Sequence, residues 1–209
     1  MKFYDCTTAP SPRRVRMFIA EKGLDIPVVE VDLAAREQHE AEFAAINPFR
    51  TVPVLELDDG TCLTTSTGIC HYLEFCYPEP PLMGRTSAHR GLVIDLDWRL
   101  EQEGFMAVGE AFRNKARSFA NNALTGPHTY NQIEGLVERG KVRTEHFFDW
   151  LNERLKSNEY VAGDFFSIAD ITALATVDFS KYIKVGPQEH HVNLQRWHNS
   201  VSSRPSARL

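Results

Sequence analysis

The chain has 209 residues and a formal net charge of −5, and 43% of its residues are hydrophobic, as in an ordinary globular protein. The acidity lies in residues 1–80, which hold 7 Lys/Arg against 13 Asp/Glu, while the remainder holds 16 against 15. An acidic chain without a basic stripe excludes nucleic-acid binding as the main activity, because that binding depends on neutralising phosphates. No segment approaches the roughly 20 apolar residues of a membrane span, and none has the form of a signal peptide. We therefore expect a cytoplasmic protein with no membrane or nucleic-acid partner.

The cysteines show neither CxxC pairs nor another spacing typical of metal ligands. They are Cys6, Cys62, Cys70 and Cys76. In a chain without an export signal, such thiols are typically reduced rather than joined in a disulfide framework. We expect free thiols, no metal site and no bound cofactor.

The first 80 residues are predicted to fold in the order β-α-β-α-β-β-α. A strand at Lys2–Tyr4 leads through a turn into a helix, with Ser11 as the expected N-cap, Pro12 at the first helical position and Gly23 at the C-terminal end. Periodicity and turn residues predict the remaining elements. These are a strand within 27–33, a short helix at 39–45, a hairpin with strands at 52–57 and 61–63, and a helix at 66–76.

Beyond the proline-rich residues 78–81, strand signals disappear and helical periodicity takes over. The expected helices lie at 89–119, 132–156, 167–182 and 191–203. Ser167 and Asp170 are spaced as a capping box at the start of one of them. The predicted class is α+β, with an α/β domain at 1–80, a linker at 81–90 and an all-helical domain at 91–209. We expect Trp98, Trp150 and Trp197 in the helical core.

A proline interrupts one predicted strand. Because Pro53 cannot donate to a ladder, it indicates either an edge strand or a cis peptide in a tight bend. A cis Val52–Pro53 bond would turn the main-chain groups of Val52 outward, where they could pair with the peptide group of a ligand. Ser66, at the start of the next helix, is either an ordinary N-cap or part of a carboxylate site built on the helix N-terminus.

The turn at residues 7–12 leads into another helix N-terminus. Thr7, Thr8 and Ser11 provide hydroxyl groups there, which either cap main-chain groups or help the helix dipole to stabilise a thiolate. A thiolate site, a carboxylate site and a main-chain clamp would together suit a small acidic peptide that carries a thiol.

Several other residues have an ordinary interpretation beside a functional one. Arg13, Arg14 and Arg16 are most simply a solvated helix face, although Arg14 and Arg50 could bind a carboxylate. His190 and His191 could suggest a metal site, but we expect polar surface, because no third ligand is evident.

Aromatic residues recur along the first long helix of the C-terminal half. Phe105, Met106, Phe112 and Phe119 are either core residues or the apolar wall of a pocket that faces the N-terminal domain.

These patterns resemble cytosolic glutathione transferases over essentially the whole chain. The resemblance rests on residues 11–16 (SPRRVR), 47–55 (NPFRTVPVL), 63–69 (LTTSTGI) and 160–172 (YVAGDFFSIADIT). It implies a thioredoxin-like N-terminal domain, a helical C-terminal domain, a homodimer, and glutathione with a small electrophile as the substrates.

The resemblance also implies roles for individual residues. Val52, before Pro53, would pair through its main chain with the cysteinyl part of glutathione. Ser66 and Thr65 would hold the γ-glutamyl carboxylate. The residues near the glycyl carboxylate would be Gln38, His39 and Arg50.

The chain departs from the family pattern at two positions. Thr65 replaces an acidic residue, and Ala9 occupies the position where many classes carry a catalytic Ser or Cys, while Tyr4 lies too early to be a clear substitute. The chain looks closest to a fungal and bacterial group without Tyr, Ser or Cys there, in which helical-domain residues hold an activating water. Here that stretch offers Asn114 and Ser118 as catalytic candidates by position.

The expected mechanism is ionisation of the glutathione thiol at the first helix, assisted by Thr8, Ser11 or a held water, followed by attack on an electrophilic carbon or a peroxide. Phe105, Phe112, Arg113 and Phe119 would line the second-substrate pocket. The alternatives are a non-catalytic binding or scaffold protein of the same fold, and a glutaredoxin-like reductase, for which Cys6 is the nearest thiol.

Overall fold

The computed structural model describes all residues, 1–209, and divides into two compact units. The first comprises residues 1–80 with 124–129 and Leu209, and the second comprises 81–123 and 130–208. All strands of the sheet lie in the first unit, and the second is built from helices and short connecting segments. The predicted class, an α/β unit followed by an all-helical unit, is confirmed.

The first unit contains a mixed four-stranded sheet with the order β2-β1-β3-β4. Its strands are β1 (Lys2–Asp5), β2 (Val28–Glu30), β3 (Val54–Glu56) and β4 (Cys62–Leu63). β1 is parallel to β2 and antiparallel to β3, and β3 and β4 form the predicted hairpin. The order of these strands along the chain and the hairpin are as predicted, whereas the order of the strands in the sheet comes from the structure.

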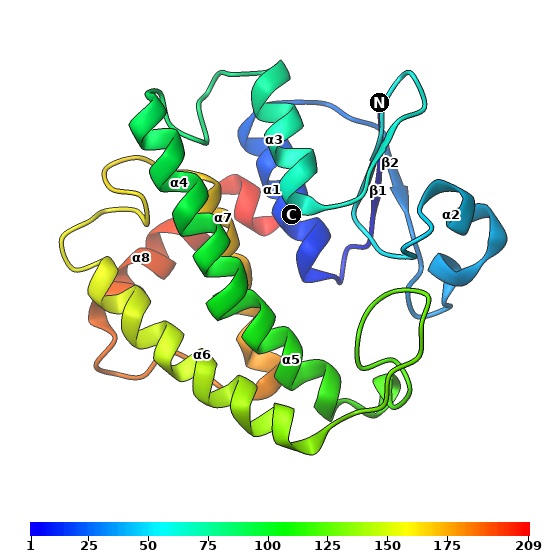
Figure 1. The fold of residues 1–209 in the computed structure, drawn as a ribbon. Coiled ribbons are helices and arrows are strands. Elements are labelled where there is room, and N and C mark those ends of the chain that lie inside the picture. Colours follow the sequence, from blue (N-terminus) through cyan, green and yellow to red (C-terminus); the bar gives the residue numbers. More distant parts are fainter. The chain divides into compact units, whose positions relative to one another are not determined.

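Successive residues of β1 face opposite sides of this sheet, as strand geometry requires. Tyr4, paired with Val54 in the register, belongs to a cluster with Phe43 of α2 (Ala41–Ile46). Phe3 and Leu55 are completely buried and, by alternation, face the other side. Helices α1 (Pro10–Glu21) and α3 (Ser66–Cys76) run side by side in this unit (Figure 1).

Two local predictions for the first unit are confirmed and one is wrong. α3 spans the predicted residues, and the Val52–Pro53 peptide bond is cis. The N-cap prediction was wrong: α1 begins at Pro10 with Ala9 as N-cap, so Ser11 lies inside the first turn. Pro10 takes the first helical position, and Pro12 lies in the same first turn, where a main-chain N–H has no partner within the helix. Neither proline therefore costs a helical hydrogen bond, and the helix starts two residues earlier than expected.

A buried ion pair connects α1 with α3. Lys22, at the end of α1, has a fully buried ammonium group 2.5 Å from a carboxylate oxygen of Glu74. The same ammonium donates to the carbonyls of Tyr77 at 2.8 Å and Pro80 at 2.6 Å. This one side chain therefore holds the chain where it leaves α3.

The second unit is built from five α-helices, with a π-helical segment, Leu100–Phe105, between the first two. The helices are α4 (Ser87–Arg99), α5 (Met106–Lys115), α6 (Glu134–Arg154), α7 (Ile168–Ser180) and α8 (Val192–Ser202). α5 and α6 approach closely at Gly140, where an added Cβ would lie 2.6 Å from the main-chain oxygen of Ala107. None of the helices is both long and apolar enough to cross a membrane.

The predicted capping box of Ser167 and Asp170 is present at the start of α7. Trp197 is completely buried, as expected, but the core prediction for the tryptophans was wrong for Trp98, which is 60% exposed. Trp150 is half-buried. Periodicity places all three on helices, but it does not decide which face of a helix is covered.

Candidate functional site

The start of α1 offers few main-chain donors. Its N-cap, Ala9, has no side chain that could cap the helix, and Pro10 and Pro12 have no N–H. The N–H of Arg13 bonds to the carbonyl of Ala9. The unpaired donors of the first turn are therefore the N–H and hydroxyl of Ser11. The preceding Thr8 adds an unpaired N–H, while its hydroxyl contacts Sγ of Cys6 at 3.5 Å.

The start of α3 meets the start of α1. Thr65 is the N-cap of α3, and its hydroxyl oxygen accepts the N–H of Gly68 at 3.0 Å. Ser66 is therefore not the cap, which corrects the simpler interpretation of this serine. Its hydroxyl donates instead to the carbonyl of Ser11 at 3.1 Å. The structure thus joins two helix N-termini that lie 55 residues apart in sequence.

Val52 presents unpaired main-chain groups in the same unit. Neither its N–H nor its C=O bonds to another residue, because the ladder between β1 and β3 ends at the pair Tyr4 and Val54. Main-chain polar groups in folded proteins nearly always have a partner. Because these two have none within the chain, they are available to a ligand.

Arg36, Gln38, His39 and Arg50 form a basic region, and the intervening acidic Glu37 accepts the N–H of Asp32 at 2.7 Å. Burial, together with the charges of Arg36 and Arg50, lowers the pKa of His39. His39 is therefore neutral at pH 7 and can donate one hydrogen bond. The side-chain oxygen of Gln38 is buried and has no partner. Arg50 has a left-handed backbone conformation, with φ of 53°. This group suits a carboxylate, and Arg36 is a member that the sequence analysis did not select.

Tyr4 is occupied by a different contact. Its hydroxyl donates to Glu56 at 2.7 Å, and burial raises the pKa of its phenol. Both observations exclude it as an activating tyrosine. Cys6 is buried and lies 3.5 Å from the hydroxyl of Thr8. It is a free thiol, as are the other three cysteines.

The prediction that Arg13, Arg14 and Arg16 form a solvated face was wrong. Arg14 is buried, and the guanidinium of Arg16 lies 2.6 Å from the buried carboxylate of Asp5. The spacing of three arginines on one helix does not reveal a carboxylate at the end of a neighbouring strand.

The second unit contains a cluster of aromatic rings. Phe112 packs against Phe119, Phe179 and Tyr182 with ring centroids 5.3–5.8 Å apart. Phe105 joins the cluster through Phe179, at 5.7 Å. The predicted pocket residues Phe105, Phe112 and Phe119 are therefore brought together, with Phe179 and Tyr182 as members that the sequence analysis missed.

Arg113 lies at the edge of this cluster. Its guanidinium is 4.2 Å from the ring centroid of Phe119 and donates to the carbonyls of Asn122 and Ala123. Burial lowers the pKa of this guanidinium. Arg113 thus holds the chain that follows Phe119 and supplies a cation beside the rings.

The two catalytic candidates from this region differ in their surroundings. Asn114 is buried, donates to the carbonyl of Glu110 at 2.9 Å and accepts the N–H of Ile133 at 2.9 Å. Its amide therefore joins α5 to the start of α6. Ser118 is exposed, in a short 3₁₀ turn.

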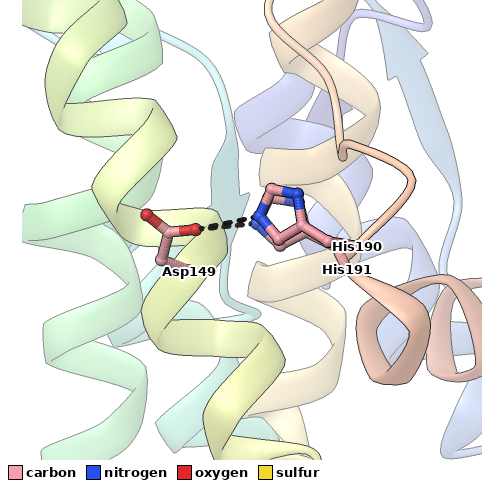
Figure 2. Close-up of side chains that lie close together, drawn as sticks. All are labelled: Asp149, His190 and His191. Carbon is pink, nitrogen blue, oxygen red and sulfur yellow. Dashed lines mark hydrogen bonds and ion pairs between the residues drawn. The ribbon is translucent and has the colours of Figure 1, made fainter.

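The two adjacent histidines have a third polar neighbour, Asp149 of α6. Figure 2 shows both imidazole rings pointing at one carboxylate oxygen, with Nε2 of His191 at 2.9 Å and Nε2 of His190 at 3.5 Å. Their hydrogen bonds lower the pKa of Asp149. No pattern in the sequence connected Asp149 with the histidines.

The hydrogen bonds of His191 argue against a metal at this cluster. Its Nδ1 accepts the main-chain N–H of Gln188 at 2.9 Å. In the neutral ring the proton is then on Nε2, which donates to Asp149 and has no lone pair for a metal. Only Asp149 and His190 would remain, and both are exposed. The cluster instead fastens the segment before α8 to α6.

Comparison with known proteins gives matches along most of the chain. A family model for the glutathione S-transferase N-terminal domain matches residues 8–75, and one for the C-terminal domain matches residues 103–205. Glutathione S-transferase 2 of Saccharomyces cerevisiae is 34% identical over 214 residues, covering 100% of this chain and 88% of that protein.

Solved structures agree with these matches. A glutathione S-transferase domain-containing protein of Marinobacter aquaeolei VT8 is 36% identical with a TM-score of 0.90, covering 99% of each chain. Gtt2 from Saccharomyces cerevisiae is 32% identical with a TM-score of 0.90, covering 100% of this chain and 99% of that one.

Proposed function

Because the chain belongs to the glutathione S-transferase family, we propose that it binds glutathione at the paired starts of α1 and α3 and stabilises its thiolate there. The observation that carries this proposal is the hydrogen bond from Ser66 to the carbonyl of Ser11, together with the unpaired main chain of Val52. One unit thus offers two helix N-termini and a main-chain clamp, which match the carboxylate, thiol and peptide groups of the tripeptide.

The γ-glutamyl carboxylate is assigned to the start of α3. The N–H groups of Ser66 and Thr67 have no partner within the chain, and the Ser66 hydroxyl lies beside them. Thr65 is committed to capping, so its role is to fix the first turn of α3. Val52 and Pro53 are assigned to the cysteinyl peptide group.

The glycyl carboxylate is assigned to the basic region of Gln38, His39 and Arg50, with Arg36 as an additional cation. Two positive charges close enough to lower the pKa of His39 would also attract a carboxylate.

Thiol ionisation is assigned to Thr8 and Ser11. The N–H groups of both residues and the hydroxyl of Ser11 are unpaired, and the Thr8 hydroxyl can accept from the Cys6 thiol and still donate its own proton. The amide of Asn114, in contrast, is already bonded to main-chain groups of its own unit. The thiol proton passes to solvent, and the sulfur then forms a bond to an electrophilic carbon as the leaving group departs. With a peroxide, the sulfur forms a bond to one oxygen as the O–O bond breaks, and an alcohol or water leaves. Without a tyrosine or serine at position 9, we expect a smaller fall in the thiol pKa than a strong side-chain donor would give.

The second substrate is assigned to the aromatic cluster of Phe105, Phe112 and Phe119, with Arg113 beside it. Apolar rings with one cation suit a small electrophile that has an aromatic or aliphatic body and a polar substituent.

We further propose a cytoplasmic homodimer that uses glutathione as co-substrate and needs no other cofactor. The free state of all four cysteines supports a reducing compartment. Phe75 in the first unit is 89% exposed and Trp98 in the second is 60% exposed, and each is a large apolar side chain of the kind that a second copy covers.

Titration of the ultraviolet absorbance of bound glutathione tests the thiolate assignment. We expect the bound thiol to ionise below the value of about 8.5 for a free cysteine thiol. The double variant with Thr8→Ala and Ser11→Ala should move the pKa back toward that value. A strongly depressed pKa in the double variant would eliminate these hydroxyls as the cause.

Calorimetry with Ser66→Ala tests the carboxylate assignment. For this assignment the Ser66 hydroxyl turns from the carbonyl of Ser11 to the carboxylate when glutathione binds, and the loss of that hydrogen bond to a charged group should weaken glutathione binding by roughly 10-fold or more. Ser87→Ala is the matched control, because Ser87 also follows a threonine N-cap, Thr86, at the first position of its helix. Equal affinities of the wild type and Ser66→Ala would contradict the assignment.

A further inference from the structure

The turn between β1 and α1 is held by a buried ion pair. The guanidinium Nη1 of Arg16 lies 2.6 Å from Oδ1 of Asp5, and the two side chains are 13% and 3% exposed. The same carboxylate oxygen accepts the N–H of Cys6 at 2.7 Å. Asp5 thus connects the last residue of β1 with the first residue of the turn.

Arg16 also reaches the other side of the turn. Nη1 donates to the carbonyl of Cys6 at 3.3 Å, and Nη2 donates to the carbonyl of Thr7 at 3.1 Å. The carbonyl of Cys6 additionally accepts the N–H of Ala9, the N-cap of α1, at 2.9 Å. Nε of Arg16 is buried without a partner, so its bonding is through the two Nη groups.

A second carboxylate fixes Thr7 from the outside. One carboxylate oxygen of Glu30, in β2, accepts both the N–H of Thr7 at 2.7 Å and its hydroxyl at 2.9 Å. Every polar main-chain group of Cys6 and Thr7 therefore has a partner. The next residue, Thr8, is the first in the turn whose N–H is unpaired.

We propose that Arg16 is a positioning residue for ionisation of the glutathione thiol: it fixes the turn that presents Thr8, and it neutralises the Asp5 carboxylate behind that turn. The inference rests on the proposed function, which places the thiolate at Thr8 and Ser11. It adds a group that does not touch the substrate.

Two separable effects follow from this geometry. The first is electrostatic, because an ionised Asp5 without its partner would oppose a second negative charge nearby and raise the thiol pKa. The second is geometric. The planar guanidinium donates to the Asp5 carboxylate and to the carbonyls of Cys6 and Thr7 at once, and a lysine ammonium at the same place lacks this planar fork of donors. Burial raises the pKa of Asp5 and Arg16 opposes that shift, so the pair acts as one unit.

The experiment compares the thiol pKa of bound glutathione in the wild type, Arg16→Met, Arg16→Lys, and Arg16→Met combined with Asp5→Asn. We expect Arg16→Met to raise the pKa by roughly one unit and to lower kcat/KM at pH 6.5 by roughly tenfold. The affinity for glutathione, measured by calorimetry, should fall by less than the tenfold that corresponds to one pKa unit, because Val52 and Ser66 are unchanged. Asp5→Asn added to Arg16→Met should recover part of the shift.

The control is Arg139→Met, which removes an arginine paired with Glu110 in the second unit. It should leave the thiol pKa unchanged. If Arg16→Met does not fold, Arg16→Lys carries the test, with an expected rise of about half a unit from the lost carbonyl contacts.

The outcomes separate this inference from the proposed function. A depressed thiol pKa in the wild type that neither Arg16 variant changes overturns the inference alone and leaves Arg16 with a purely structural role. A wild-type thiol pKa equal to that of free glutathione overturns the proposed activation, and the inference with it.

Discussion

Asp170, at the start of α7, is the buried group whose replacement should have the largest effect on the helical unit. It is completely buried and accepts hydrogen bonds from the N–H of Val161, the N–H and hydroxyl of Ser167, and Nε1 of Trp197, at 2.8–3.2 Å. In Asp170→Asn an amide NH₂ replaces one carboxylate oxygen and faces donors. We expect a loss of about 3 kcal/mol in the free energy of unfolding at pH 7.5.

The loss should depend on pH in a direction that the structure determines. Burial raises the pKa of Asp170 from 3.8 to about 6, although its hydrogen-bond donors oppose this shift. A folded-state pKa above the unfolded value means that the folded protein takes up a proton first as the pH falls. The wild type therefore gains stability from this group as the pH falls from about 6 toward 4, and the asparagine variant does not. The gap between the two should widen by about 1.4 kcal/mol from pH 7.5 to pH 5.0.

Urea unfolding at the two pH values, followed by tryptophan fluorescence, measures this gap, because Trp197 is buried and bonded to Asp170. Other carboxylates titrate equally in both proteins and cancel in the difference. The control is Asp164→Asn, at an exposed position. The difference between its free energy of unfolding and that of the wild type should be the same at both pH values. A gap that stays constant or narrows at pH 5.0 would refute the reasoning, because the hydrogen bonds would then outweigh burial.

Two further substitutions test the packing of each unit. Gly140→Ala should lower the free energy of unfolding by about 2 kcal/mol, because the added Cβ would lie 2.6 Å from the main-chain oxygen of Ala107. Its control is Gly109→Ala, which has open space around it and should be neutral or stabilising in the same urea titration. Lys22→Met should cost about 3 kcal/mol or more, because it leaves the Glu74 carboxylate buried without its cation; a loss below 1 kcal/mol in thermal or urea unfolding would contradict a buried pair.

Local sequence patterns were sufficient for most of the elements. The helix at 66–76, the hairpin of β3 and β4, and the capping box of Ser167 and Asp170 were all predicted and confirmed. In each case the determining interactions join residues that are close in sequence, such as a cap and the third residue after it. The cis bond before Pro53 was likewise one of the two conformations that the proline allowed.

The arrangement of the site depended on contacts between distant residues. The sequence named Ser11 and Ser66 but assigned both to capping or ligand binding, and only the fold showed one bonded to the other. Similarly, Arg16 was predicted to face solvent, but the end of β1 places Asp5 beside it. Periodicity identifies the face of a helix, but the neighbouring strand decides whether that face meets water or a carboxylate.

The amino-acid sequence by itself therefore determined the family, the order of the elements and the chemistry available at each helix start. The tertiary structure decided which of these groups are already bonded and which remain open to a ligand. The physical reason is that a hydrogen bond satisfied between distant segments removes a donor or acceptor from use, and no local pattern records that bond.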